Sequence, residues 1–239
     1  MIDIQYTTHI EELLKIPELH PQPASLHVPD WYKKTPATNN NNPNILGKEQ
    51  RKLLPIYKTV KTCPSFHDVF SEGIVLTAPC DIHIWLSKDN KVTKWLMAID
   101  SEWINLEVHD ELQWLNYYNN KKIRKVFKFS SPWYFRLPKG YSFRQIPYTY
   151  SEHNEWTVPY GVVNTDVYSE LNPQILYTSE EDEILIKAGE PLCYLVPYKR
   201  EKSKLKLLNK GKSRDNLLDE HQREGYIVNM SNRTGYFKL

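Results

Sequence analysis

Cysteine is scarce in this sequence of 239 residues, and the few that occur form no motif. The three cysteines, Cys63, Cys80 and Cys193, are an odd number, lie far apart and include no Cys-x-x-Cys pair. A disulfide framework or a zinc site needs paired or closely spaced cysteines, so the sequence favours neither. We expect three reduced thiols in a reducing compartment, behaving as small apolar side chains.

Neither charge nor hydrophobicity is concentrated in any part of the chain. The 31 Lys and Arg residues nearly balance the 29 Asp and Glu residues, for a formal net charge of +2. This balance gives no electrostatic basis for binding duplex nucleic acid or an anionic membrane surface. No segment approaches the roughly 18 consecutive apolar residues of a membrane span, and the first residues do not resemble a signal peptide. We therefore expect neither membrane nor nucleic-acid partners, and a protein that is cytoplasmic when made.

Common metal-binding and catalytic motifs are also absent. None of the eight histidines belongs to a His-x-x-x-His pair, the arrangement of helical metal sites. Gly211-Lys212-Ser213 matches the end of a phosphate-binding P-loop, but Lys206 stands where the first glycine of that loop belongs. His153-Asn154-Glu155 is not followed by the Pro-Cys-x-x-Cys of zinc deaminases. The sequence predicts no cofactor, with Mg²⁺ expected only if the chain binds a nucleotide.

Glycine is rare as well, with 8 residues, whereas the chain has 16 prolines, 16 tyrosines and 7 tryptophans. Aromatic residues favour strands, and proline favours stiff turns. Hydrophobic and polar residues alternate in residues 81–86, which is the pattern of a half-buried strand. Similar short segments recur between turns and predict a sandwich or barrel: 74–76, 92–99, 103–108, 126–129, 133–141, 143–146, 156–163, 174–177 and 183–186.

The segments that flank this β-rich region differ from it. Residues 1–58 form an irregular, proline-rich N-terminal arm with one short helix expected over residues 9–19. Trp31 and Tyr32 lie in this arm, and we expect them to pack on the chain's own core, with a neighbouring subunit as the alternative. Residues 59–201 form the main domain. Residues 202–239 form a charged C-terminal helix and tail, and residues 110–122 fit either a short helix or a strand.

Four short motifs follow one another through the main domain: Ala78-Pro79-Cys80-Asp81-Ile82, Leu137-Pro138-Lys139-Gly140, Gly161-Val162-Val163-Asn164-Thr165-Asp166, and the apolar segment 184–197 around Gly189. Gly140 and Gly161 are 21 residues apart, and Gly161 and Gly189 are 28 residues apart. In order and spacing this series resembles the corners of the dUTPase and dCTP-deaminase-like β-clip fold. The resemblance covers residues 73–198. It implies a mainly β fold, a dUTPase-like β-clip barrel or sandwich that carries the irregular N-terminal arm and the helical, charged C-terminal segment.

The sequence departs from this family at the positions that carry its chemistry. Tyr148 and its neighbours stand where the family has an Arg-Ser-Gly phosphate-binding turn, and they bring no guanidinium. Asn164 replaces the catalytic aspartate, and an amide cannot accept a proton from water as a general base. Val167 replaces the tyrosine that stacks on uracil, although Tyr168 follows it. The resemblance therefore implies no catalytic residue and a set of candidate ligand-binding residues: Asp81, Tyr148, Asn164, Asp166 and Tyr168.

A broader resemblance, over residues 29–201, is to an uncharacterised domain family of phage and bacterial genomes, through Pro29-Asp30-Trp31 and residues 59–66, 161–166 and 189–201. It implies a viral origin. Together the two resemblances favour a catalytically inactive dUTPase-like viral protein, a virion structural or accessory protein that acts by assembly or binding. The resemblance implies a homotrimer, with other virion or host proteins as partners and incorporation into a virion. The alternative is a nucleotide-binding, nucleotide-sequestering or nucleotide-hydrolysing protein of the same fold. A third hypothesis is a carbohydrate-binding sandwich that contacts sugars through exposed aromatic residues.

Overall fold

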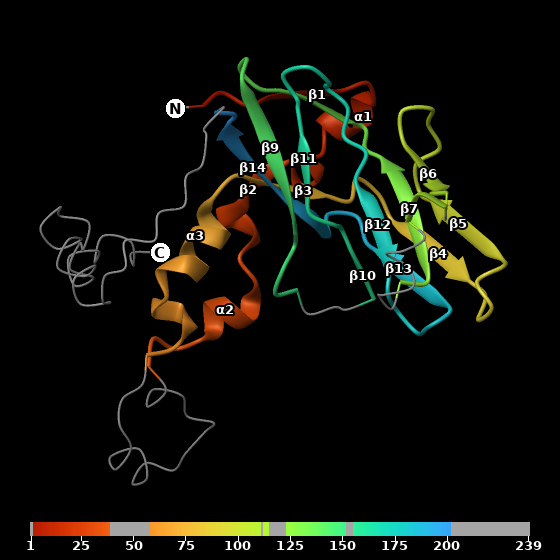
Figure 1. Ribbon diagram of the computed structural model, residues 1–239, viewed down its shortest axis with the longest axis horizontal. Coiled ribbons are helices and arrows are strands. Elements are labelled where there is room, and N and C mark those ends of the chain that lie inside the picture. The colour runs from red at the N-terminus through yellow and green to blue at the C-terminus, as the bar shows by residue number, and fades with distance from the viewer. Residues whose placement is uncertain (1, 39–57, 111, 115–122, 152–154, 202–239) are drawn as a thin grey trace, which may run out of the picture. The chain divides into compact units, whose positions relative to one another are not determined.

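The computed structural model describes residues 2–38, 58–110, 112–114, 123–151 and 155–201. The described residues up to Arg200 belong to one compact unit, in which strands dominate (Figure 1). The mainly β fold that the sequence predicts is confirmed. None of the helices among the described residues is long and apolar enough to cross a membrane. The expected C-terminal helix and most of residues 110–122 lie outside the described residues.

The largest sheet has five antiparallel strands in the order β11-β9-β14-β3-β2. Its centre is formed by the long strands β9 (Tyr141–Pro147) and β14 (Pro191–Lys199), which pair from Tyr141 opposite Lys199 to Pro147 opposite Cys193. On one side of β9 lies β11 (Gly161–Val163). On the other side of β14 lie β3 (Ile74–Thr77) and β2 (Gln22–Pro23). Residues 142 and 148, at opposite ends of β9, therefore lie at different places in the fold.

Three smaller antiparallel sheets complete the β structure. One has the order β10-β12-β7-β6, with β10 (Trp156–Thr157), β12 (Gln174–Tyr177), β7 (Lys125–Ser130) and β6 (Asn105–Val108). Another is formed by β13 (Glu183–Ile186), β4 (Ile82–Leu86) and β5 (Thr93–Met97), and the last by β1 (Gln5–Thr8) and β8 (Trp133–Arg136).

One expected strand is divided in two. The sequence predicts a single strand over residues 156–163, whereas the structure has β10 and β11, which belong to different sheets. Pro159 lies between them, and it has no backbone N–H to continue a ladder. The chain therefore leaves one sheet and enters the other within a few residues, which brings the two sheets together at the Tyr148 end of β9.

Apolar side chains from all four sheets meet in one core. The alternation in β4 is confirmed, because Ile82, Ile84 and Leu86 are buried while His83 and Trp85 are only partly buried. Fully burying a side chain such as these isoleucines contributes about 1.5–3 kcal/mol each. The largest fully buried side chains of this core are Trp133, Tyr177, Phe127, Phe129, Phe135 and Phe143.

The sequence predicts that all three cysteines behave as small apolar side chains, and two of them are buried accordingly. Cys80 and Cys193 are buried and free, while Cys63 is partly exposed. Burial raises the pKa of Cys193 to about 12, so this thiol stays protonated at neutral pH.

The N-terminal arm packs on the chain's own core, as expected. Its helices are α1 (Glu11–Leu14), η1 (Pro17–Leu19), η2 (Ala24–His27) and α2 (Asp30–Lys34), and η5 (Val60–Thr62) and α3 (Pro64–Ser71) follow it. Tyr32 of α2 and Phe70 of α3 are buried in a second apolar cluster with Tyr194 of β14. The helix expected over residues 9–19 is divided into α1 and η1 at Pro17, which cannot donate the backbone hydrogen bond of a continuing helix.

Candidate functional site

A polar corner joins three segments of the five-stranded sheet where β9 begins and β11 and β14 end. We call Gly140, Ser142, Asn164, Asp166 and Arg200 the Asp166 corner. The Gly140 N–H donates to Asp166 Oδ2 at 2.9 Å, and the Arg200 guanidinium donates to the same oxygen. The Arg200 N–H in turn donates to the Gly140 carbonyl at 2.7 Å. Asp166 therefore ties the turn before β9 to the residue that follows β14.

The backbone of this corner explains its residue types. Gly140 has a φ of +85°, a left-handed conformation that glycine adopts without the steric cost of a side chain. Asn164 Oδ1 accepts a hydrogen bond from Ser142 Oγ at 2.7 Å, and the Asn164 carbonyl accepts two from the N–H groups of the turn that follows β11. The amide of Asn164 thus holds β11 to β9, so its observed contacts are those of a structural residue.

The carboxylate of Asp166 is buried and charged. Its side chain is 5% exposed, and that of Arg200 is 33% exposed. The Gly140 N–H, and then the Arg200 guanidinium, lower the pKa of Asp166 below its ordinary value. A lower pKa makes this carboxylate a weaker base. Asp166 Oδ1 and Thr165 Oγ1 are buried without a hydrogen-bond partner in the described part of the chain.

Two other candidate residues lie outside this corner. Asp81 Oδ1 accepts a hydrogen bond from the Ala188 N–H at 2.8 Å, so Asp81 joins the start of β4 to the turn between β13 and β14. Gly189 of that turn has a φ of +80°, which accounts for glycine there. Tyr168 borders the corner, because its N–H donates to the Asn164 carbonyl at 2.9 Å, but the residue is 70% exposed. Neither residue extends the Asp166 corner into a pocket.

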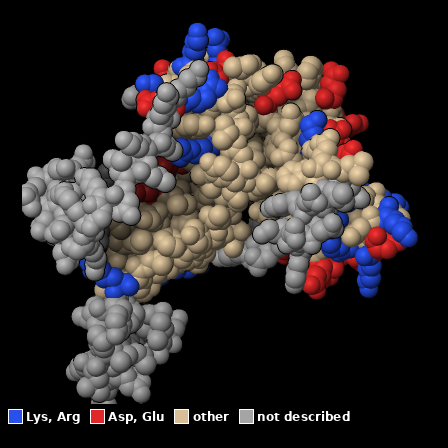
Figure 2. All heavy atoms as spheres, in the orientation of Figure 1, with Lys and Arg blue, Asp and Glu red and all other residues tan. Residues whose placement is uncertain are grey.

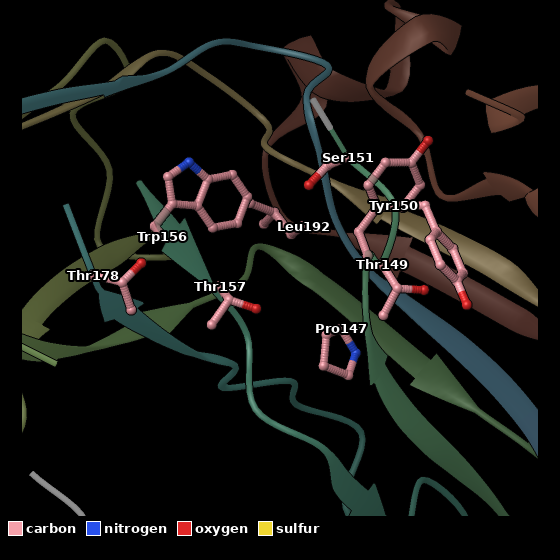
Figure 3. Close-up of a pocket in the computed structure, with 9 residues that line it drawn as sticks. Pro147, Thr149, Tyr150, Ser151, Trp156, Thr157, Thr178 and Leu192 are labelled. Carbon is pink, nitrogen blue, oxygen red and sulfur yellow. The ribbon is translucent and has the colours of Figure 1, made fainter. Parts of the chain in front are cut away.

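The fifth candidate, Tyr148, lines a cavity of about 430 Å³ at the other end of β9. We call this the Tyr148 cavity. Its lining comes from the end of β9 and the loop after it, from β10, from the residue after β12 and from β14. Figure 3 shows Trp156 on one side of the space and the segment that contains Thr149 and Ser151 on the other. The lining residues are Pro147, Tyr148, Thr149, Tyr150, Ser151, Trp156, Thr157, Thr178 and Leu192.

The N-terminal arm holds the wall of the Tyr148 cavity in place. Tyr148 donates its hydroxyl hydrogen to the His27 carbonyl at 2.5 Å, and its ring stacks on Tyr194 with centroids 5.0 Å apart. Burial raises the pKa of Tyr148, so its hydroxyl remains a donor. Trp31 Nε1 donates to the Tyr150 carbonyl at 2.8 Å, and the Tyr150 ring contacts Phe66 at a centroid distance of 4.9 Å.

Tyr150 has an unusual backbone conformation. Its φ is +65°, in the left-handed region that bulky residues rarely occupy. Such a residue costs free energy and persists where its surroundings determine its conformation. Sequence reasoning missed the conformation of Tyr150, because nothing in the letters Tyr-Thr-Tyr-Ser signals a positive φ. It also missed Trp31 as the donor that fixes this loop, since the two residues are 119 positions apart.

The structure therefore does not bring the five candidate residues together in one chain. Ser142 lies in β9 and hydrogen-bonds to Asn164, and Tyr148 comes directly after β9, six residues further along the chain. This separation corresponds to roughly 20 Å at about 3.3 Å per residue. Asp81 lies at a third place. On the face seen in Figure 2, many charged side chains lie toward the margins, and Arg144 of β9 is exposed opposite Val162 of β11.

Comparisons with known proteins give a distant likeness to two solved dUTPases. No protein-family model matches the chain, and no curated protein does. The dUTPase of EIAV, in its native form, has a TM-score of 0.34 and 10% identity, over 60% of this chain and 88% of that one. A mutant of the Staphylococcus bacteriophage 80alpha dUTPase has a TM-score of 0.30 and 12% identity, over 57% of this chain and 100% of that one. Both TM-scores are below 0.5.

Proposed function

We propose that this chain is a catalytically inactive viral protein of dUTPase-like fold that acts by assembly or binding, as a virion structural or accessory protein. The observation that carries this proposal is the division of the candidate residues between separate places, where they are used within the chain. Asn164 and Asp166 hold strands together at one end of β9, while Tyr148 lies at the other end. General-base catalysis needs a basic group within hydrogen-bond reach of the reacting water, next to the bound substrate.

The surface around β11 supports assembly. β11 is an edge strand of the five-stranded sheet, and an edge strand offers unpaired backbone groups to another chain. Apolar side chains on and beside β11 are exposed, with Val162 50% and Tyr160 61% exposed, followed by Val167 and Tyr168. Exposed apolar groups that lie together are typical of protein–protein contact surfaces. We propose that copies of the chain associate here as a homotrimer, and that virion or host proteins bind the assembly.

Two measurements on the purified protein test this proposal. The protein is incubated with dUTP, dCTP and the other deoxynucleoside triphosphates with Mg²⁺, and the nucleotide products are separated by chromatography, which detects loss of phosphate, loss of pyrophosphate and deamination. We expect no turnover above the rate without protein, and rapid turnover of any of them overturns the proposal of inactivity. Asp166→Asn is the matched variant, since hydrolysis that it abolishes would place catalysis at the Asp166 corner.

The second measurement is the mass in solution, by light scattering after gel filtration. We expect three times the mass of the 28.3 kDa chain for the unaltered protein, and a lower mass for Val162→Lys. The exposed Arg144 lies opposite Val162 on β9, so a lysine here adds a second positive charge to an apolar contact without an anionic partner, which weakens association. Val92→Lys is the control, because Val92 is 55% exposed in the loop before β5. A monomer at all concentrations, or equal effects of both substitutions, contradicts association through β11.

The alternative function, nucleotide binding or sequestration in a pocket between subunits, has one observation in its favour. Asp166 Oδ1 and Thr165 Oγ1 are buried and lack partners in the described part of the chain, and buried polar atoms usually have one. If this alternative holds, one nucleotide binds tightly without turnover, and Asp166→Ala weakens its binding. Mg²⁺ belongs to this alternative alone.

A further inference from the structure

The Tyr148 cavity has the size and position of a ligand site. It lies where the five-stranded sheet, through β9 and β14, meets the sheet that contains β10 and β12. Its volume of about 430 Å³ falls in the range of roughly 300–1,000 Å³ typical of small-molecule sites. Because its walls come from four segments of the chain, the space is formed by the fold itself.

The lining of this cavity is neutral and rich in hydroxyl groups. None of the described residues that line it is Asp, Glu, Lys, Arg or His. Thr149, Ser151, Thr157 and Thr178 bring hydroxyl groups from three segments, and each hydroxyl both donates and accepts hydrogen bonds. The hydroxyls of Thr149 and Thr157 make no hydrogen bond within the described part of the chain. Pro147, which is partly exposed, adds apolar surface, whereas Leu192 is buried.

The charges next to the cavity are mainly negative. A second cavity, of about 620 Å³, shares Trp156 with the first and is lined by Glu155, Glu181, Glu183 and Glu190, with Lys187 as its single cation among the described residues. A phosphate group in the Tyr148 cavity would meet no cation among the described lining residues and would lie beside these carboxylates. Removing a charge from water without a partner is costly, so this cavity disfavours an anion.

The wall of the cavity is pre-organised. Tyr150 keeps its left-handed φ of +65° because Trp31 binds its carbonyl and Phe66 packs on its ring. The Tyr148 hydroxyl is bound to the His27 carbonyl. Residues held in costly conformations cluster at binding sites, and a rigid wall lowers the entropic cost of binding.

We propose that the Tyr148 cavity binds a neutral saccharide, with the hydroxyl groups of one or two sugar rings bound by Thr149 and Thr157. The C–H groups of a sugar ring would pack on Pro147, and its hydroxyl groups exchange hydrogen bonds with the threonines, which both donate and accept. The ligand is a free sugar or the terminal sugar of a glycan, which share this chemistry. This inference is independent of the proposed function, since it uses neither the Asp166 corner nor the oligomeric state.

The test uses the full-length protein and two kinds of ligand. Binding of common neutral mono- and disaccharides is measured by calorimetry at up to about 10 mM, because weak sites have Kd values near 1 mM. A glycan array, with the labelled protein, distinguishes terminal sugars of glycans from free sugars. We expect at least one neutral saccharide to bind. Thr157→Val and Thr149→Val should each weaken binding about five- to tenfold, since each removes one hydrogen bond.

A matched control separates the site from the fold. Thr93→Val makes the same change in β5, outside the cavity, and we expect it to leave the affinity unchanged. Thermal melts show whether each variant is folded, and valine has nearly the shape of threonine. The proposal is overturned if no saccharide or glycan binds, or if the cavity variants bind as well as Thr93→Val. Competition between a nucleotide and the saccharide would overturn the neutral ligand class, but only hydrolysis of that nucleotide would also overturn the proposed inactivity.

Discussion

The two ends of strand β9 carry opposite kinds of polar structure. At the Gly140 end, the Asp166 corner joins charged groups whose hydrogen bonds go to one another and to the backbone. At the Pro147 end, the Tyr148 cavity contains hydroxyl groups and no charged lining residue in the described part of the chain. The first end is closed around its own contacts, and the second leaves space for a ligand. An acidic residue in a sequence motif, such as Asp166, therefore need not lie where a ligand fits.

The two ends of β9 also differ in the kind of residue that adopts a positive φ. Gly140 provides a left-handed turn at low cost, as glycine does in many structural corners. Tyr150 adopts a similar φ with a bulky side chain and needs Trp31 and Phe66 to hold it. The corner is thus stabilised by residues suited to their conformations, whereas the cavity wall depends on support from the N-terminal arm.

The largest expected effect comes from removing that support with Trp31→Ala. Trp31 is partly buried, so we expect a loss of about 2–3 kcal/mol in the free energy of unfolding, below the 3–5 kcal/mol of fully buried tryptophans. For a domain of this size this is roughly a 5–10 °C fall in Tm, read from a thermal melt. Trp31→Phe keeps an aromatic ring and loses the N–H donor, and should cost about 1 kcal/mol. If Trp31→Ala costs no more than Trp31→Phe, the packing of the arm does not support the cavity wall.

Much of the fold could be predicted from the sequence, because the patterns that indicate strands and turns are local in the sequence. Alternating segments such as residues 81–86 bury every second side chain, so their pattern is visible in the letters. Gly140 and Gly189 marked turns correctly, because both need a positive φ. The helix α3 was not expected, although Pro64 stands at its first turn, where proline fits well.

The site could be predicted less well, because it depends on contacts between distant positions. Arg124 illustrates this: its guanidinium donates to carbonyl oxygens of Ser87 and Glu181, which are 37 and 57 residues away, and to the carboxylate of Asp182. No local pattern signals that role. In the same way, the hydroxyls of Thr149 and Thr157 face one cavity only because β10 and the end of β9 come together. The five candidate residues were chosen by their place in motifs, which says nothing of what each side chain contacts.

A second prediction concerns acid and the Asp166 corner. The pKa of Asp166 is lowered by folding from its ordinary value of 3.8. Its charged form therefore adds stability that is present above pH 3.8 and is lost as the pH falls through the lower pKa of the folded state. We expect Asp166→Asn to lower the Tm at neutral pH and to make the Tm less dependent on pH below 5.

The control for this prediction is Asp89→Asn. The pKa of Asp89 is also lowered, chiefly by the Ser87 hydroxyl, but this carboxylate lies on the surface. Exposed ionic contacts contribute little to stability because water screens them, so Asp89→Asn should change the pH dependence much less. The interpretation of the corner is wrong if both variants keep the same slope of Tm against pH as the unaltered protein.

The smallest expected effect is the difference between alanine substitutions at two glycines of the same sheet, one just before β9 and one in β11. A Cβ at Gly140 would meet no atom within 4 Å, so the cost of Gly140→Ala comes from its φ of +85° alone, about 1–2 kcal/mol. Gly161 in β11 has no positive φ, and a Cβ there would meet Gln145 Nε2 at 3.7 Å, an ordinary contact. Gly161→Ala should therefore be neutral or stabilising by up to about 0.5–1 kcal/mol, because alanine loses less backbone entropy than glycine in a strand. Urea unfolding of the two variants gives the difference directly, and changes of the same sign and size would contradict the claim that, of these two positions, Gly140 requires glycine and Gly161 does not.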